Sequence, residues 1–145
     1  AGEVVSFQSY LTPVLANTLT SNPPLSDYAG QGPLDEAAFA QAVDDVMARP
    51  QTFAATLAQI SADAAISGLP ENLGWSRLMG SLIGLELSGA RPYWLGQNVV
   101  IAGDGVLPTL YKSALATQAE QAQLISREEL SLAGLRQAWV QLSKG

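Results

Sequence analysis

The sequence predicts a helix-rich α/β fold. Toward the carboxyl end, segments of strand and helix character alternate, and this order implies at least one right-handed parallel crossover. Between residues 33 and 89, apolar residues recur at helical spacing instead, which predicts further helices packed on the α/β layer. With 145 residues, 48% of them hydrophobic and 14% charged, the chain is large enough for a core, and we expect one domain over residues 1–145.

The first expected element is a strand that leads into a helix. Residues 3–11 are rich in β-prone side chains, and Val5 and Phe7 alternate with more polar neighbours. Thr12 is predicted to be the N-cap of the helix. Pro13 suits the first helical position, where its missing N–H would have had no partner in any case. A loop rich in proline and glycine is expected to follow over residues 21–32.

Two helices are predicted next. The first covers residues 33–49 and stops before Pro50, with Asp35 and Glu36 near the positive end of its dipole. Its apolar face consists of Phe39, Val43, Val46 and Met47. The second helix opens at about Pro50 and closes at Gly68, because glycine is the residue type that most readily ends a helix.

A third helix, over residues 72–89, is so apolar that we expect it to be buried on most sides. Gly80 and Gly84 stand one turn apart in it. Glycine costs a helix about 1 kcal/mol relative to alanine, so another part of the protein should approach the backbone closely at both positions. Tight packing in the core is the simplest interpretation.

The clearest strand is the apolar run at residues 99–102, which we expect to be buried. The turn Gly103-Asp104-Gly105 and a helix over residues 106–118 follow it. A second short strand is predicted at residues 123–125. Ser126 then caps the last helix, with Glu129 in the position of a capping box. The apolar face of that helix consists of Leu130, Leu135, Trp139 and Leu142.

Charge and composition exclude several classes of function. A net charge of −6 argues against a surface for nucleic acid or for anionic membranes, because both need basic residues. The chain contains no Cys and no His, so hydrolysis by Ser-His-Asp or Cys-His groups is excluded, as is a sulfur-ligated metal. No apolar run reaches the roughly 18 residues of a membrane span, and we expect a cytoplasmic protein.

The best candidate for a ligand site is the turn Gly103-Asp104-Gly105. Ligands of α/β proteins bind at the carboxyl ends of strands, where glycine lets a ligand approach the backbone and the next helix offers free N–H groups. The alternative for Asp104 is a structural role as a helix N-cap. The spacing does not match the dinucleotide-binding fingerprint, and the chain lacks the Gly-Lys-Ser/Thr of a P-loop.

Glu86 interrupts an otherwise apolar stretch. A buried carboxylate needs a partner, for which Arg77 and Arg91 are candidates, whereas an exposed corner of the helix would need none. The exposed corner is the simpler interpretation.

The segment Met-Gly-Ser-Leu-Ile-Gly-Leu-Glu-Leu at residues 79–87, followed by Gly-Ala-Arg-Pro-Tyr-Trp-Leu-Gly at residues 89–96, resembles the pattern of 2-dehydro-3-deoxygalactonokinases. Other family features agree in order: the segment over residues 7–15, the helix with Phe53, and the late strand–helix unit over residues 100–115. The resemblance covers essentially the whole chain.

This resemblance implies the carboxy-terminal, ribonuclease H-like half of an actin-like sugar kinase. Such kinases use ATP and Mg to phosphorylate the terminal hydroxyl of 2-dehydro-3-deoxy-D-galactonate in a cleft between two halves. The family's phosphate-binding turns, Asp-x-Gly-Ser/Thr and Pro-Gly-Thr-His-Ser/Cys-Lys-Trp, belong to the other half and are absent from this sequence. We therefore expect no catalytic residue and no metal ligand in this chain, which would be a truncated or processed product that needs the amino-terminal half as its partner.

The resemblance also implies site residues. Gly103, Asp104 and Gly105 would lie near the nucleotide. Gly84 and Glu86 are further candidates for the same adenosine side of the cleft. Of the family's Thr-Gly-Glu motif only Thr12 carries over. Proline and valine replace the glycine and the cleft-facing glutamate at positions 13 and 14.

Two alternatives remain open. The chain could be a catalytically inactive, stand-alone binding or dimerisation module derived from the kinase fold, or a plain structural domain. Apolar surface on the side of the absent half predicts self-association, and a homodimer would be the simplest form of it.

Overall fold

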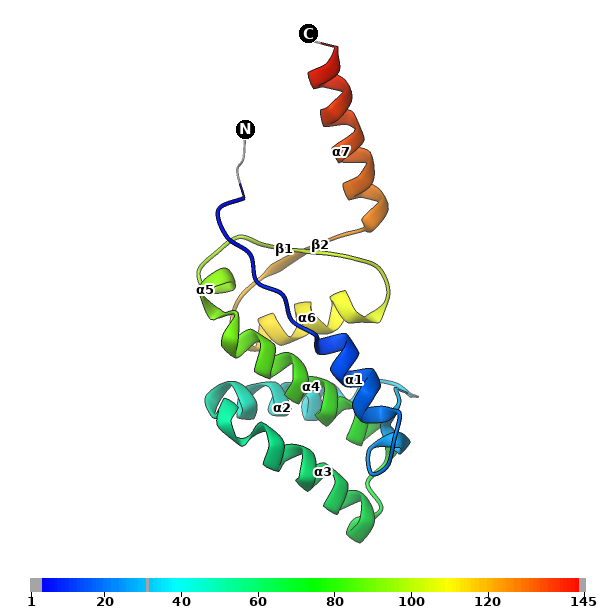
Figure 1. Ribbon diagram of the computed structural model, residues 1–145. Helices are drawn as coiled ribbons and strands as arrows, with labels where there is room; N and C mark the ends of the chain where they lie inside the picture. The colour runs from blue at the N-terminus through cyan, green and yellow to red at the C-terminus, as the bar shows by residue number, and fades with distance from the viewer. Residues whose placement is uncertain (1–3, 31, 144–145) are drawn as a thin grey trace. The chain divides into compact units, whose positions relative to one another are not determined.

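The computed structural model describes residues 4–30 and 32–143, which form two compact units, residues 1–93 and residues 94–145 (Figure 1). The elements of the first unit are α1 (Thr12–Thr20), η1 (Ser26–Tyr28), α2 (Glu36–Ala48), η2 (Pro50–Thr52), α3 (Phe53–Ser67) and α4 (Glu71–Gly89). The boundary between the units falls within the short helix α5 (Arg91–Trp94). The second unit contains β1 (Val99–Ala102), α6 (Val106–Thr117), β2 (Ala122–Ile125) and α7 (Arg127–Leu142). The prediction of a helix-rich α/β fold is confirmed.

The amino-terminal segment differs from its prediction. Residues 4–11 form no strand, because no other described segment provides the ladder partner that a strand requires. Residue 3 of the predicted strand lies outside the described residues. The following helix is present, with Pro13 in its first turn, but Leu11 is its N-cap and Thr12 is already helical. The prediction of Thr12 as N-cap was therefore wrong, because its side chain makes a different hydrogen bond.

Helices α2 and α4 form the core of the first unit. The N-cap of α2 is Asp35, whose carboxylate accepts a hydrogen bond from Ala38 N at 2.9 Å. All four residues of the predicted apolar face of α2 are buried, and Phe39, Val43 and Val46 are at most 1% exposed. The helix ends at Ala48, just before Pro50, as predicted.

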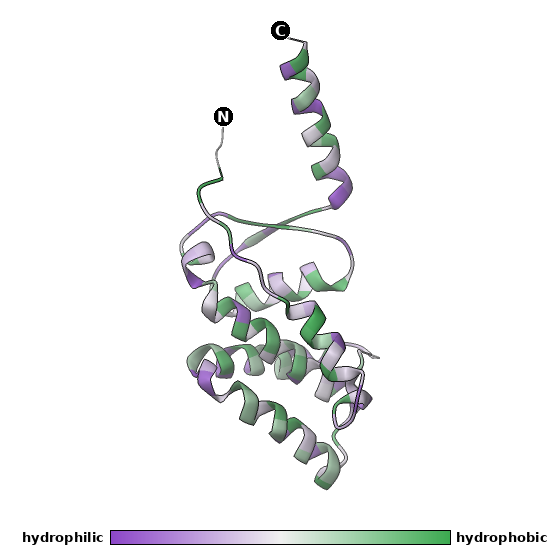
Figure 2. Ribbon diagram, viewed as in Figure 1, coloured by the Kyte–Doolittle hydropathy of each residue, from purple (hydrophilic) through white to green (hydrophobic). Residues whose placement is uncertain are grey.

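Helix α4 is buried along most of its length, as predicted, and Figure 2 shows hydrophobic residues along it between more polar ones. A Cβ atom at Gly80 would lie 2.5 Å from the carbonyl oxygen of Phe39, and one at Gly84 would lie 2.8 Å from that of Val43. The backbones of α2 and α4 thus touch at two points one turn apart. The interpretation of both glycines as core packing is confirmed.

Helix α3 completes the first unit. It ends at Gly68, which adopts a φ of +67° and donates a backbone hydrogen bond to Ala64 at 3.2 Å, so the predicted stop is confirmed. Ile60 is fully buried, and Asp63 of α3 pairs with Arg77 of α4 at 2.7 Å. None of the helices in the described part of the chain is long and apolar enough to cross a membrane.

In the second unit, β1 and β2 pair in parallel, with Val99 opposite Ala122 and Ala102 opposite Ile125. Helix α6 connects them, which confirms the predicted parallel crossover. The prediction that β1 is buried was wrong, because its residues alternate between half-buried and exposed and Val100 is 56% exposed. The described sheet has two strands, and α6 packs against it, so alternate side chains face away from the helix.

The last helix begins as the sequence predicts. Ser126 Oγ accepts a hydrogen bond from Glu129 N at 3.1 Å, and the Glu129 carboxylate accepts one from Ser126 N at 3.0 Å. The predicted apolar face also forms, but Leu135, Trp139 and Leu142 are between 68% and 80% exposed. Helix α7 therefore presents an apolar side that the described part of the chain leaves uncovered.

The capping box predicts a pH dependence. Hydrogen bonds from the backbone and side chain of Ser126 lower the pKa of Glu129 below its ordinary value of 4.5. A lowered pKa stabilises the folded helix at higher pH, and this contribution is lost as pH falls through the folded-state value. We expect amide exchange at the start of α7, corrected for intrinsic rates, to accelerate as pH falls through the lowered pKa of Glu129.

Glu129→Gln should remove most of that pH dependence, whereas the neighbouring Glu128→Gln should retain it. Hydrogen exchange with mass spectrometry measures both. Equal pH profiles for the two variants would contradict the assignment.

Candidate functional site

The parallel pairing of β1 and β2 brings two turns together at one edge of the sheet. Gly103 N donates a hydrogen bond to Ile125 O at 3.1 Å, so the pairing extends just past the end of β1. The turn 103–105 leads into α6, and Ser126 leads into α7. The start of both helices, where backbone N–H groups are free of intrahelical partners, therefore lies at this edge.

Asp104 joins the two turns. Its Oδ1 accepts a hydrogen bond from Arg127 N at 3.4 Å, and its Oδ2 lies 3.7 Å from Arg127 Nε. The N-cap of α6 is Gly105, without any side-chain hydrogen bond, so the N-cap interpretation of Asp104 was wrong. The side chains of Asp104 and Arg127 are 57% and 81% exposed, so their ion pair contributes little stability and leaves the carboxylate accessible.

Gly105 has a backbone conformation that requires glycine. Its φ of +87° and ψ of −161° belong to a region that residues with a Cβ essentially never adopt. A Cβ there would meet no atom within 4 Å, so the space beside Gly105 is open. An open, glycine-lined approach to an uncapped helix start, next to an accessible carboxylate, suits a polar ligand whose hydroxyl groups can donate to Asp104.

The structure also brings together two weaker candidates in the first unit. Thr12 is buried, and its hydroxyl donates a 2.5 Å hydrogen bond to Glu86 Oε2. Glu86 is half-buried, so the exposed-corner interpretation was wrong, and the proposed partner Arg77 pairs with Asp63 instead. The hydroxyl of Tyr10 is buried without a hydrogen-bond partner among the described residues.

Gly84, the remaining candidate, is fully enclosed. It is on the face of α4 that packs on Val43, and core packing alone accounts for it.

Comparison with known proteins decides the family. Residues 1–138 match the family model of the 2-keto-3-deoxy-galactonokinases. The chain belongs to this family. It is 29% identical, over 139 residues, to a protein of Rhizobium meliloti (strain 1021) named as a probable 2-dehydro-3-deoxygalactonokinase, DgoK1, and the match covers 93% of this chain and 45% of that protein.

A crystal structure from Sinorhizobium meliloti has a similar fold, with a TM-score of 0.79 and 30% sequence identity. It is provisionally named as a 2-dehydro-3-deoxygalactonokinase protein. The similarity covers 92% of this chain and 44% of that one. This galactonokinase-family chain thus spans slightly less than half the length of the relatives that it matches.

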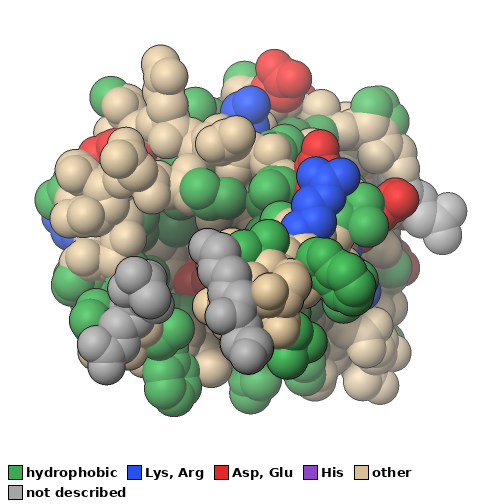
Figure 3. Space-filling model, turned by 90° about the horizontal axis from the view of Figure 1, so that it is seen from above, with side chains coloured by type: hydrophobic (Ala, Val, Ile, Leu, Met, Phe, Trp, Pro, Cys, Tyr) green, Lys and Arg blue, Asp and Glu red, His purple; other side chains and the backbone are tan. Residues whose placement is uncertain are grey.

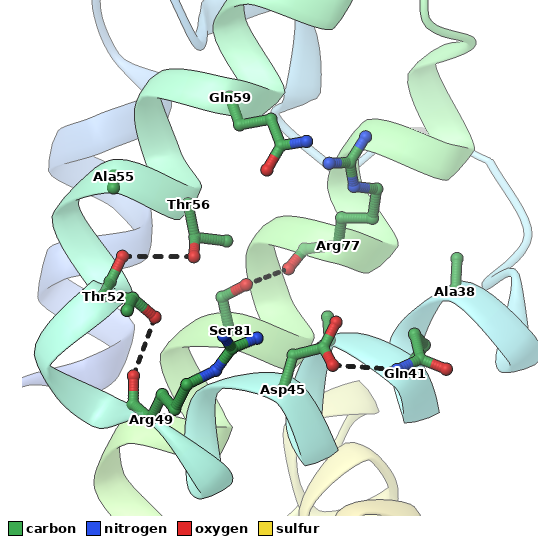
Figure 4. Close-up of a pocket in the computed structure, with 11 residues that line it drawn as sticks. Ala38, Gln41, Asp45, Arg49, Thr52, Ala55, Thr56, Gln59, Arg77 and Ser81 are labelled. Atoms are coloured by element: carbon green, nitrogen blue, oxygen red, sulfur yellow. Dashed lines mark hydrogen bonds between the residues drawn. The ribbon is translucent and has the colours of Figure 1, made fainter.

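One cavity of this galactonokinase-family chain was not predicted from the sequence. It has a volume of about 320 Å³ and opens between α2, α3 and α4 (Figure 4). The polar residues that line it are Gln41, Asp45, Arg49, Thr52, Thr56, Gln59, Arg77 and Ser81. No sequence motif points to it, because these residues come from α2, η2, α3 and α4 and from the connection at Arg49.

Most polar groups of this cavity already have protein partners. The hydroxyls of Thr52, Thr56 and Ser81 donate to backbone carbonyls at 2.7 to 3.2 Å. The Arg77 guanidinium binds Asp63, and Gln41 donates to Asp45 at 2.9 Å. The cavity is therefore a surface depression between helices whose polar groups are mostly paired within the protein.

A divalent metal needs several oxygen ligands converging on one point. The described residues of this galactonokinase-family chain contain no group of three or more acidic side chains that could hold one. Asp104 and Glu86 each stand as a single carboxylate. The described residues therefore offer no complete protein cage for a divalent ion.

Proposed function

We propose that this chain forms the adenosine side of the active cleft of an ATP-dependent sugar-acid kinase, which phosphorylates 2-dehydro-3-deoxy-D-galactonate at its terminal hydroxyl. The observation that carries the proposal is the match of residues 1–138 to the 2-keto-3-deoxy-galactonokinase family. The chain would correspond to the carboxy-terminal, ribonuclease H-like half of the enzyme. The amino-terminal half, outside this sequence, would supply the phosphate turns.

The sheet edge supports a contact with the nucleoside part of ATP. Asp104 is an accessible acceptor for ribose hydroxyl groups, and the open space beside Gly105 allows the ligand to approach the backbone. A carboxylate beside the helix start repels phosphate, which has the same sign of charge. The geometry therefore favours the sugar and base over the phosphates at this edge.

Phosphoryl transfer depends on positioning and on compensation of negative charge. Mg²⁺, when bound, supplies part of that compensation at the phosphate oxygens. We assign the metal ligands and the general base to the other half, to which the family resemblance also assigns the phosphate turns. The role of this chain is to bind and orient the nucleoside.

The departure at positions 13 and 14 provides a direct test of the assigned reaction. A chimera would carry this chain in place of the matched 45% of the Rhizobium meliloti relative. A coupled ADP-release assay with 2-dehydro-3-deoxy-D-galactonate should show background rates for this chain alone and a low rate for the chimera. Restoring the family motif with Pro13→Gly and Val14→Glu should raise the rate by roughly tenfold or more, because the cleft-facing carboxylate would again help to position the substrate.

Turnover by the unmodified chain alone would contradict the division of labour between the halves. A folded chimera that shows no substrate-dependent ADP release, with or without the restored motif, would contradict the kinase assignment.

The apolar side of α7 favours a second candidate, an inactive dimerisation module. Leu135, Trp139 and Val140 lie on one side of this helix and are 43 to 73% exposed. If the module is the correct function, sedimentation should show a dimer that Trp139→Asp dissociates, and the motif-restored chimera should remain inactive. A monomer at all concentrations would exclude this candidate.

A further inference from the structure

The amino-terminal segment is the most exposed apolar segment in the described part of the chain. Val4, Val5 and Phe7 are 83 to 93% exposed, and Leu11 is 66% exposed. Figure 3 shows hydrophobic side chains at the surface in the view from above, dispersed among other side chains and backbone. An apolar surface of this kind marks a contact with another part of a protein.

The same segment has the sequence of a strand and lacks the hydrogen bonds of one. Residues 4–10 carry β-branched and aromatic side chains, yet they form no helix and pair with no described strand (Figure 1). Among the described residues, Val4 to Tyr10 take part in no backbone hydrogen bond outside regular elements. The backbone N–H and C=O groups of these seven residues are thus available to form hydrogen bonds with a partner or with water.

The segment also lacks the features with which proteins protect an open strand edge. Natural edge strands carry charges or proline, because an unprotected edge pairs with other chains. Residues 4–12 contain neither a charged residue nor a proline. A segment of this composition is typical of a strand that is covered in the complete protein.

We propose that residues 4–10 form a β-strand that pairs with a strand from the part of the family's polypeptide that lies outside this chain. The relatives are long enough to provide it, since this chain matches only 45% and 44% of their lengths. The inference rests on the proposed function, because it assumes that the chain works as one half of the kinase. It adds the surface through which the two halves join.

Polar contacts along the segment fit this arrangement. The hydroxyls of Ser6 and Tyr93 share a hydrogen bond of 2.8 Å, which holds the Ser6 side against the first unit. Val5 and Phe7 would point to the opposite side in an extended strand. At the end of the segment, the buried Tyr10 hydroxyl has no partner among the described residues, and a polar group of the incoming chain would satisfy it.

A second copy of this chain is the less suitable occupant. A second molecule also has a net charge of −6, so the two copies would repel each other. It would offer the same uncharged segment and no existing sheet edge for that segment to join. The partner must present an open strand edge with an apolar face, which the described residues of this chain do not provide outside the short pair β1 and β2.

Hydrogen exchange in the chimera described above tests the proposal without depending on affinity between separate chains. We expect amides of residues 4–10 to exchange rapidly in this chain alone and at least about tenfold more slowly in the chimera. Exchange in α4 should be slow in both and serves as the measure of folding. The substitutions Val5→Asp and Phe7→Asp together should restore rapid exchange in the chimera. Ile66→Asp, at a residue of α3 that is 83% exposed, is the matched control and should change nothing.

Three other outcomes would overturn the proposal. Rapid exchange of residues 4–10 in a chimera with a protected α4 would show that the segment stays unpaired. Protection in this chain alone that grows with concentration would identify a second copy as the partner, and protection in the dilute monomer would show that the chain itself provides the partner. Protection in a chimera without turnover would leave this inference standing and contradict only the kinase assignment.

Discussion

Gly80→Ala is expected to destabilise the first unit by about 2 kcal/mol. The new Cβ would lie 2.5 Å from the carbonyl oxygen of Phe39 and 2.9 Å from the Cβ of Ala42. Backbone atoms cannot turn away as a side chain can, so α2 and α4 must move apart. Such overpacking costs up to about 3 kcal/mol, and the gain in helix propensity of about 1 kcal/mol from glycine to alanine offsets only part of it.

Gly134→Ala is the matched control, because this helical glycine of α7 has no neighbouring atom within 4 Å of the Cβ position. Only the difference in helix propensity between glycine and alanine then affects the free energy of unfolding. We expect no loss of stability and a gain of up to about 1 kcal/mol. Urea unfolding followed by circular dichroism measures both variants. If Gly80→Ala were as stable as the parent chain, the close approach of α2 and α4 would be refuted.

The sequence predicted the helical part of the fold well because its signals are local. The face of α2, the stop at Gly68 and the capping box at Ser126 each depend on residues within a few positions of one another. These groups find their partners inside one helix or at its end. Such elements form in nearly the same way whatever the rest of the protein contains.

The segment over residues 4–11 was predicted less well because a strand depends on a partner distant in sequence. Its composition favours a strand, yet no described part of this chain pairs with it. The same reason explains why Val100 is exposed although the apolar sequence of its strand predicts burial. It also explains why the apolar side of α7 is uncovered. Each of these residues has an apolar pattern without a covering surface in the described chain.

For the candidate site, the sequence identified residues better than it identified their contacts. Glycine at 103 and 105 and the end of a strand were visible in the sequence, whereas the hydrogen bond from Arg127 N to Asp104 joins two turns more than twenty residues apart. The hydrogen bond from Thr12 to Glu86 spans 74 positions. Only the fold brings these pairs together.

The largest effect on ligand binding is expected from Gly105→Ala. Its φ and ψ angles lie in a region nearly exclusive to glycine, so alanine should cost the second unit about 1 to 3 kcal/mol or force the turn to rearrange. The methyl group would also enter the open space beside the turn. If the nucleoside of ATP approaches there, both changes should weaken its binding, by tenfold or more.

Gly96→Ala separates the loss of binding from the loss of stability. Gly96 belongs to the same unit, has a φ of +67°, and has no atom within 4 Å of its Cβ position, so alanine should strain the backbone there as well. A thermal-shift titration with a non-hydrolysable ATP analogue measures the response, which amounts to about 1.4 kcal/mol at ten times the Kd. The parent chain and Gly96→Ala should both respond, and Gly105→Ala should not. An equal thermal shift in both variants would contradict the placement of the nucleotide site at residues 103–105. It would show that a change of the backbone at Gly105 does not affect binding of the ligand.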